Sequence, residues 1–119
     1  LEYGLTIFGG KSGEYPQKLY KALMNSQTVL TVWDDARLVG LIRVLDDSEM
    51  LAQIHYVLVH PEYQGQGIAG RMVEYIKEKY KNFMYLELMP EDKNNVPFYE
   101  KHGFHVMENG AAMQICNIN

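Results

Sequence analysis

Apolar and polar residues alternate along the first half of the chain in a way that predicts β-strands. Residues 28–33, 37–45 and 50–59 are rich in β-branched and aromatic side chains, and polar turns at 34–35 and 46–48 separate them. Connections this short join neighbouring antiparallel strands. The pattern therefore predicts a three-stranded antiparallel sheet.

Two stretches have the spacing of an amphipathic helix. One begins at Pro16, and the other follows the glycines at 65–67 and ends near Lys81. Their apolar faces consist of Leu19, Ala22 and Leu23 in the first helix and of Ala69, Met72, Val73, Ile76 and Tyr80 in the second. The second helix joins the strand at 50–59 to a further apolar run at 83–89. Such a crossover connection predicts that these two strands lie parallel.

The last part of the chain predicts a short helix and a hairpin. The helix covers about 96–102 and stops at Gly103, a residue type that suits the end of a helix. Segments 104–107 and 111–117 are then expected to pair across Asn109-Gly110, a dipeptide typical of tight turns.

The segment before Pro16 is the least informative. Residues 3–8 fit a short strand or the end of a helix, because glycines interrupt the pattern, and residues 11–14 fit a polar turn. Together the elements predict a mixed α/β fold: a twisted, mostly antiparallel sheet with one central parallel pair, flanked by about three helices. We expect residues 1–119 to form a single domain, since this length allows one hydrophobic core.

Composition narrows the functional classes. With 47% hydrophobic and 22% charged residues, the chain has the composition of a globular protein. Because its net charge is −4, we do not expect a basic surface that binds nucleic acid. No apolar stretch reaches the ~20 residues of a membrane span, and no signal-peptide pattern opens the chain, so we expect no membrane association and a cytoplasmic location. Cys116 is the single cysteine, which fits a reducing compartment, and we expect it to be buried in the last strand. The spacing of the histidines predicts no metal site.

The stretch Gln64-Gly65-Gln66-Gly67-Ile68-Ala69-Gly70 carries the strongest functional signal. It leads from an apolar strand directly into the second helix. Glycines at a helix start leave backbone N–H groups accessible, and the helix dipole adds partial positive charge at that end. We therefore predict a cradle for phosphate or pyrophosphate.

A dinucleotide site is an alternative interpretation of the same glycines. Gly65, Gly67 and Gly70 spell Gly-x-Gly-x-x-Gly, and Glu87 follows at about the distance of a ribose-binding acid. The dinucleotide motif opens a parallel βαβ unit, however, whereas here antiparallel strands come first, and residues 60–64 separate the strand from the first glycine. The context disfavours this alternative.

Two motifs resemble those of the GNAT acetyltransferase superfamily. Gln64, Gly67 and Ala69 match its acetyl-CoA signature, Gln/Arg-x-x-Gly-x-Gly/Ala, and the sequence Val-His-Pro-Glu-Tyr at 59–63 is common before that signature. The sequence Phe-Tyr-Glu-Lys-His-Gly-Phe at 98–104 resembles the family's late-helix motif. Order and spacing agree over about residues 28 to 118, whereas the first 25 residues resemble the family only loosely.

The resemblance implies where acetyl-CoA binds. The pyrophosphate is expected on the backbone N–H groups of the glycine turn, and the pantetheine arm beside the strand that carries Val57 and Val59. The Val57 N–H matches the family's donor to the thioester carbonyl. Asn94 and Asn95 are candidates for a contact with CoA, although the family usually has its asparagine at the position of Asp92. The expected contacts come from Val57, Leu58, Val59, Gln64, Gly65, Gln66, Gly67, Ile68, Ala69, Gly70, Asn95, Phe98 and Tyr99.

Two side chains are expected to carry the chemistry. Tyr99 matches the family's tyrosine near the CoA sulfur, and a phenol with a pKa of about 10 can protonate a departing thiolate. By strand alternation His55 shares a face with Val57 and Val59, and a neutral imidazole can take a proton from an alkylammonium. Residues 55–60 resemble the arylalkylamine N-acetyltransferases, in which two histidines serve the amine, although Gln53 replaces one of them here. The alternative for Tyr99 is a tyrosine packed in the core with its hydroxyl satisfied, and the alternative for His55 is a strand histidine whose hydrogen bonds are satisfied.

The resemblance implies an N-acetyltransferase that moves acetyl from acetyl-CoA to a primary amine by direct attack in a ternary complex. The expected acceptor is a small-molecule amine or a peptide amine. Both a monomer and a homodimer are compatible with the sequence. A non-catalytic acyl-CoA-binding or sensor module of the same fold is the alternative, and such a module has no need of the Tyr99 hydroxyl.

Overall fold

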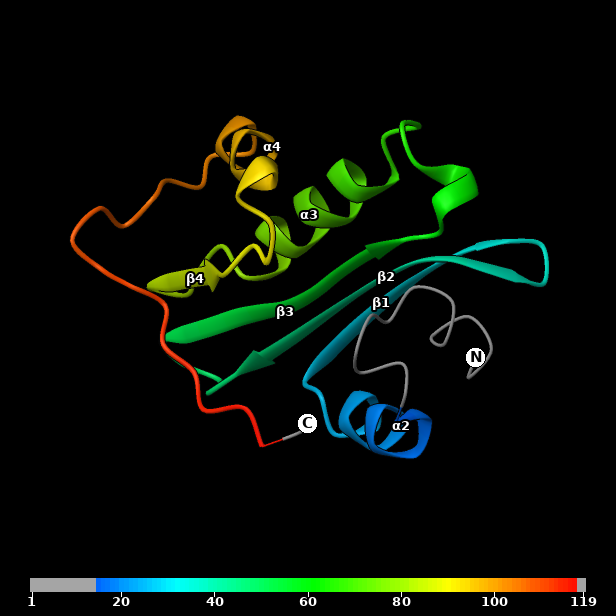
Figure 1. The fold of residues 1–119 in the computed structure, drawn as a ribbon, viewed down its shortest axis with the longest axis horizontal. Coiled ribbons are helices and arrows are strands. Elements are labelled where there is room, and N and C mark those ends of the chain that lie inside the picture. The colour runs from blue at the N-terminus through cyan, green and yellow to red at the C-terminus, as the bar shows by residue number, and fades with distance from the viewer. Residues whose placement is uncertain (1–14, 118–119) are drawn as a thin grey trace. The chain divides into compact units, whose positions relative to one another are not determined.

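The computed structural model describes residues 15–117, so the expectations for 3–8 and 11–14 lie outside the described residues. Two short 3₁₀ turns, Pro61–Tyr63 and Lys93–Asn95, accompany the helices and strands. The chain divides into two compact units, Leu1–Leu88 and Met89–Asn119. The elements along the chain (Figure 1) are α2 (Pro16–Met24), β1 (Thr28–Asp34), β2 (Arg37–Asp46), β3 (Leu51–Val59), α3 (Ile68–Lys79), β4 (Tyr85–Leu88) and α4 (Val96–Lys101).

The first unit contains one four-stranded sheet in the order β1-β2-β3-β4. β2 pairs antiparallel with both β1 and β3, whereas β3 and β4 pair in parallel. The long connection through α3 allows this parallel pairing, because a tight turn can join only antiparallel neighbours. The mixed α/β class, the three antiparallel strands and the parallel pair are therefore confirmed, but in the described sheet this pair lies at one edge rather than in the centre.

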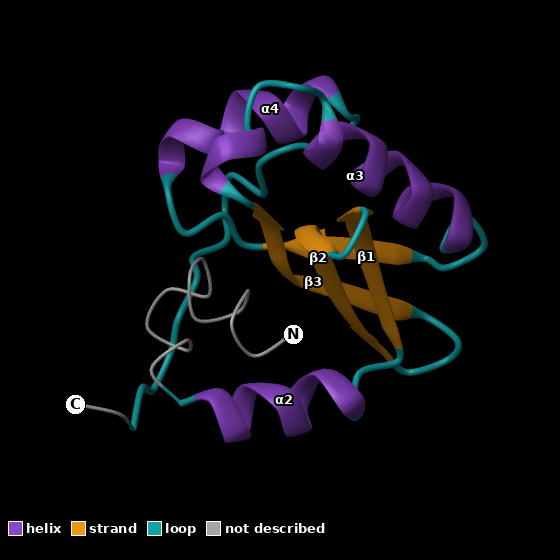
Figure 2. Cartoon of the chain, turned by 90° about the vertical axis from the view of Figure 1, so that its right-hand side faces the viewer, coloured by secondary structure: helices purple, strands orange, loops and turns teal. Residues whose placement is uncertain are grey.

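Helices cover both faces of this sheet (Figure 2). On one face Leu19 and Leu23 of α2 pack with Leu41 of β2, and the half-buried Tyr56 and Leu58 of β3 join this cluster. On the opposite face α3 contacts β2 and β3, and it buries Met72, Val73 and Ile76. β2 is covered from both sides, so residues 38–42 are all buried rather than alternating.

Gly40 of β2 lies beneath the start of α3. A Cβ at this position would lie 3.1 Å from Ile68 Cγ2 and 3.3 Å from both Cε and Sδ of Met72. The missing side chain therefore lets the beginning of α3 pack closely on the sheet.

Gly40→Val is expected to lower the free energy of unfolding by about 1–3 kcal/mol, because the added methyl groups overpack this contact. Urea unfolding followed by circular dichroism measures the change. Gly110→Val is the matched control, because its nearest neighbour would be a backbone oxygen 3.5 Å away in the second unit. Equal losses in both variants would show that contact with α3 is not what constrains Gly40.

A β-bulge interrupts β3 at His55. Arg43 pairs with Tyr56, but the next residue of β2, Val44, pairs with Ile54, so His55 is the extra residue on β3. Ile54 therefore faces the α3 side together with Val57, which lies opposite Ile42. The prediction from simple alternation, that Ile54 lies opposite Val57 and Val59, is wrong because the bulge shifts the alternation by one residue. His55 contacts Arg43, so it lies opposite Ile54 as predicted but does not share the face of Val57 and Val59.

The second unit contains α4, and it corrects two predictions. Residues 104–117 contain no strand, so the hairpin predicted from 104–107 and 111–117 does not form, although Gly110 N–H donates to the Met107 carbonyl at 3.0 Å in a turn. Met113 and Ile115 are 93% and 88% exposed, and a two-stranded hairpin is marginal unless one face is buried. Cys116 is exposed rather than buried.

Candidate active site

The glycine turn has the backbone conformation that the sequence requires. Gly65 and Gly67 have φ angles of +83° and +84°, in the left-handed region that favours glycine. Residues 64–67 are exposed, and a Cβ on either glycine would meet no atom within 4 Å. The backbone angle therefore demands glycine here, and the space beside the turn is open.

The turn leads into the N-terminus of α3, which no side chain caps. Gly67 is the N-cap residue, the first helical turn has no acidic residue, and Arg71 N–H donates to the Gly67 carbonyl at 3.1 Å. The N–H groups of residues 68–70 precede this first bond, so they have no carbonyl acceptor in the helix. Exposed N–H groups at the positive end of a helix dipole form a favourable place for a phosphate group.

The edge of β3 that faces away from β2 leads to this turn. Parallel pairing with β4 runs only from Leu51 to Ile54, whereas β3 continues to Val59. His60 N–H donates to the Val39 carbonyl of β2 at 2.8 Å, so by backbone alternation the N–H groups of Val57 and Val59 point away from β2. The Gln64 side chain donates to the Val59 carbonyl at 3.2 Å on this same edge. The backbone of Leu58 faces β2 instead.

A network that sequence reasoning missed ties residues 60–63 to the β1–β2 turn. The Tyr63 hydroxyl donates to Asp34 at 2.5 Å, and this bond raises the pKa of Tyr63. Arg37 pairs with Glu62 at 3.2 Å, while His60 is 6% exposed and its Nδ1 accepts from the Glu62 N–H at 3.1 Å. These contacts fix the segment that connects β3 to the glycine turn.

His55 is exposed, and its ring contacts Arg43 of β2. Arg43 Nη1 lies 2.5 Å from His55 Nδ1, and Arg43 Nε donates to the Ser26 hydroxyl at 2.7 Å. The Ser26 hydroxyl in turn donates to the Ala22 carbonyl in α2 at 2.7 Å. A guanidinium group can only donate, so His55 Nδ1 accepts and the neutral ring carries its proton on Nε2. Sequence reasoning missed Arg43, because the bulge brings it to His55.

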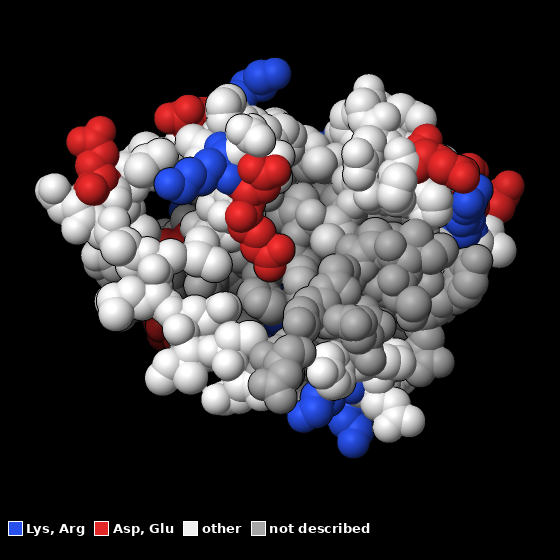
Figure 3. Space-filling model, in the orientation of Figure 1, with Lys and Arg blue, Asp and Glu red and all other residues white. Residues whose placement is uncertain are grey.

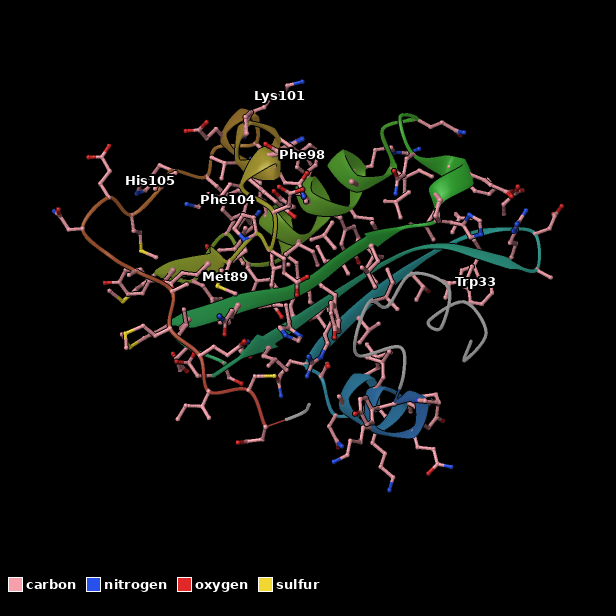
Figure 4. The ribbon with its side chains drawn as sticks, viewed as in Figure 1. Trp33, Met89, Phe98, Lys101, Phe104 and His105 are labelled. Atoms are coloured by element: carbon pink, nitrogen blue, oxygen red, sulfur yellow. The ribbon has the colours of Figure 1, made fainter. Side chains whose placement is uncertain are left out.

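Tyr99, Phe98 and Asn95 belong to the second unit. Tyr99 is half-buried on α4, and burial raises the pKa of its phenol. Its ring centroid lies 5.0 Å from that of Phe98 and 6.0 Å from that of Phe104, the aromatic residues within and just beyond α4 (Figure 4). Asn95 is exposed and immediately precedes α4. The structure thus brings the glycine turn and β3 together in one unit and these three residues together in the other.

The described residues show neither a surface patch of one charge in Figure 3 nor a cluster of metal ligands. Lys, Arg, Asp and Glu side chains of both signs are interspersed on the face shown in Figure 3. Within residues 15–117 there is no group of three or more His, Cys, Asp or Glu residues that could hold a metal ion. In this same range no helix has both the length and the apolar character needed to cross a bilayer.

Comparison with known proteins places the chain among acetyltransferases. Residues 5–104 match the Acetyltransferase (GNAT) family. Because this match covers most of the sequence, the chain belongs to the GNAT acetyltransferase family.

Individual relatives agree with this assignment. The chain is 28% identical over 99 residues to an uncharacterized N-acetyltransferase of Prochlorococcus marinus, covering 79% of this chain and 55% of that protein. It therefore spans little more than half the length of this relative. A GNAT family acetyltransferase of Streptococcus pneumoniae has 28% identity and a TM-score of 0.73, covering 87% of this chain and 79% of that one. A GNAT family acetyltransferase of Elizabethkingia anophelis, solved with acetyl-CoA bound, has the same fold, with 20% identity, a TM-score of 0.64 and coverage of 76% and 62%.

Proposed function

We propose that this chain transfers acetyl from acetyl-CoA to a primary amine by direct attack in a ternary complex. The observation that carries the proposal is the glycine turn, in which two left-handed glycines and an uncapped helix N-terminus adjoin the open edge of β3. Membership of the family and the acetyl-CoA complex of the Elizabethkingia protein support it.

The residues present fit the substrate. Backbone N–H groups of residues 64–70 would hold the pyrophosphate, because residues 64–67 are exposed and residues 68–70 form the positive end of α3. The outward N–H groups of Val57 and Val59 would pair with the amides of the pantetheine arm, as an added strand does. Asn95 and Phe98 complete the proposed contacts, whereas the backbone of Leu58 faces β2 and its side chain packs against the cluster with α2.

Val57 N–H would donate to the thioester oxygen and stabilise the negative charge that develops there as the amine attacks the carbonyl carbon. The carbon–sulfur bond then breaks, Tyr99 gives its proton to the departing thiolate, and the proton that the new amide nitrogen loses restores the phenol. Because burial raises the pKa of Tyr99, the phenol still carries that proton at neutral pH.

His55 is the proposed base for the ammonium of the acceptor. The atom that would take the proton is Nδ1, since Nε2 already carries one. Arg43 occupies Nδ1 in the structure, so the guanidinium has to leave this nitrogen before proton transfer.

The test is calorimetric titration with acetyl-CoA, CoA and NAD in parallel. We expect acetyl-CoA and CoA to bind with dissociation constants on the order of micromolar and NAD to give no signal. Binding of NAD alone would restore the dinucleotide interpretation of Gly65, Gly67 and Gly70. Binding of acetyl-CoA without acetylation of any amine would instead favour the non-catalytic sensor module.

A further inference from the structure

Arg43 is a cation whose surroundings in the described residues are neutral. It is half-buried in the middle of β2, and burial lowers the pKa of its guanidinium. The ion pairs within residues 15–117 are Arg37–Glu62, Lys77–Glu74 and Lys81–Glu78, and none involves Arg43. Its side-chain hydrogen bonds to the described residues go to the Ser26 hydroxyl and the His55 imidazole, which are both uncharged.

This arrangement is costly without a ligand. A partly desolvated charge is stabilised most by an opposite charge, and a neutral hydroxyl and imidazole replace only part of the lost hydration. A guanidinium has five N–H donors, of which the contacts with Ser26 and His55 use two. The remaining planar donors suit a carboxylate, which a guanidinium binds through two parallel hydrogen bonds.

Arg43 lies close to the residues that are proposed to carry out the reaction. Arg43 lies opposite Tyr56 in the sheet and contacts the exposed ring of His55. Val57, the proposed donor to the thioester, follows His55 by two residues, which span at most about 7 Å. A small acceptor can therefore reach from the guanidinium to the reacting carbonyl.

We propose that Arg43 is a specificity-determining residue that binds a carboxylate of the acceptor, so that the acceptor is an amine that also carries a carboxylate, as an amino acid does. This inference rests on the proposed acetyl transfer. When a carboxylate binds the guanidinium of Arg43, it also breaks the contact between Arg43 and His55 Nδ1. The imidazole lone pair then becomes available to the ammonium of the same acceptor, so binding and proton removal are coupled.

The experiment compares matched acceptors that differ only in the carboxylate. The pairs are phenylalanine and phenethylamine, ornithine and putrescine, and a dipeptide with a free or an amidated C-terminus, each assayed by CoA release at fixed acetyl-CoA. We expect the carboxylate member of at least one pair to have a kcat/KM about 10- to 100-fold higher, the scale of a charge-assisted hydrogen bond. Arg43→Gln should reduce this ratio to about one, mainly through KM, and Arg43→Lys should retain part of it. Lys18→Gln removes the same charge from an exposed position on α2 and should leave the ratio intact.

The outcomes separate the two proposals. Acetylation of both members of every pair with equal kcat/KM in the wild type would overturn the carboxylate inference and leave the acetyltransferase proposal standing. A ratio unchanged in a folded Arg43→Gln variant would assign carboxylate recognition to another residue and also overturn the inference. Failure to acetylate any amine, despite acetyl-CoA binding, would overturn the proposed function itself. If Arg43→Gln does not fold, equal kcat/KM values in the wild type still overturn the inference, and the ratio in Arg43→Lys tests whether a wild-type preference depends on Arg43.

Discussion

Tyr99→Phe is expected to lower turnover about 10- to 1,000-fold while the affinity for acetyl-CoA stays within a factor of about three, because the change removes an acid catalyst and keeps the ring. The ring contributes packing against Phe98 and Phe104, and phenylalanine preserves its shape. The hydroxyl alone supplies the proton that the departing thiolate needs. A large loss of kcat with unchanged binding is therefore the signature of the proposed role.

Steady-state kinetics and calorimetry on the same preparation measure the two quantities for Tyr99→Phe. Tyr75→Phe is the matched control, because Tyr75 is an exposed tyrosine of α3 in the other unit. Undiminished turnover in Tyr99→Phe would remove its hydroxyl from the mechanism. A parallel loss of stability and binding would favour the alternative that Tyr99 only packs in the core.

The elements that could be predicted from the sequence are those with local causes. The spacing of Met72, Val73 and Ile76 gives α3 its buried face, and the same periodicity is visible in the sequence. The glycine turn was likewise predictable, since a left-handed backbone angle at Gly65 and Gly67 calls for glycine whatever surrounds it. Both features depend on neighbouring residues alone.

The features that escaped prediction depend on partners distant in the sequence. The bulge at His55 is a property of the register between β2 and β3, and a period of two along β3 alone cannot reveal it. The contacts of Arg43 with His55 and of Tyr63 with Asp34 likewise join residues that are distant in the sequence.

The predicted hairpin failed for a similar reason. Residues 104–107 and 111–117 have a suitable turn dipeptide between them, but a strand also needs a neighbouring strand and a face to bury. The exposure of Met113 and Ile115 shows that their side chains do not gain this burial. Cys116, which was expected to be buried in the same strand, is exposed with them.

Gly67→Ala is expected to weaken acetyl-CoA binding about 10- to 100-fold, the loss of one charge-assisted hydrogen bond, and to lower the free energy of unfolding by about 1–2 kcal/mol. The unfolding term arises from φ = +84°, which a side chain disfavours even though its Cβ would meet no atom within 4 Å. The binding term arises because a methyl group here occupies the open space beside the N–H groups that are proposed to hold the pyrophosphate.

Gly67→Asn separates the backbone effect of a side chain at Gly67 from crowding of the ligand. Asparagine tolerates left-handed angles better than alanine, so Gly67→Asn should unfold at a higher urea concentration than Gly67→Ala. Its side chain is larger, however, so calorimetry should show acetyl-CoA binding at least as weak as in Gly67→Ala. Gly110→Ala, in the second unit, controls for the general effect of replacing glycine. If Gly67→Asn regains affinity together with stability, backbone strain explains the whole effect, and the space beside Gly67 is not where the pyrophosphate binds.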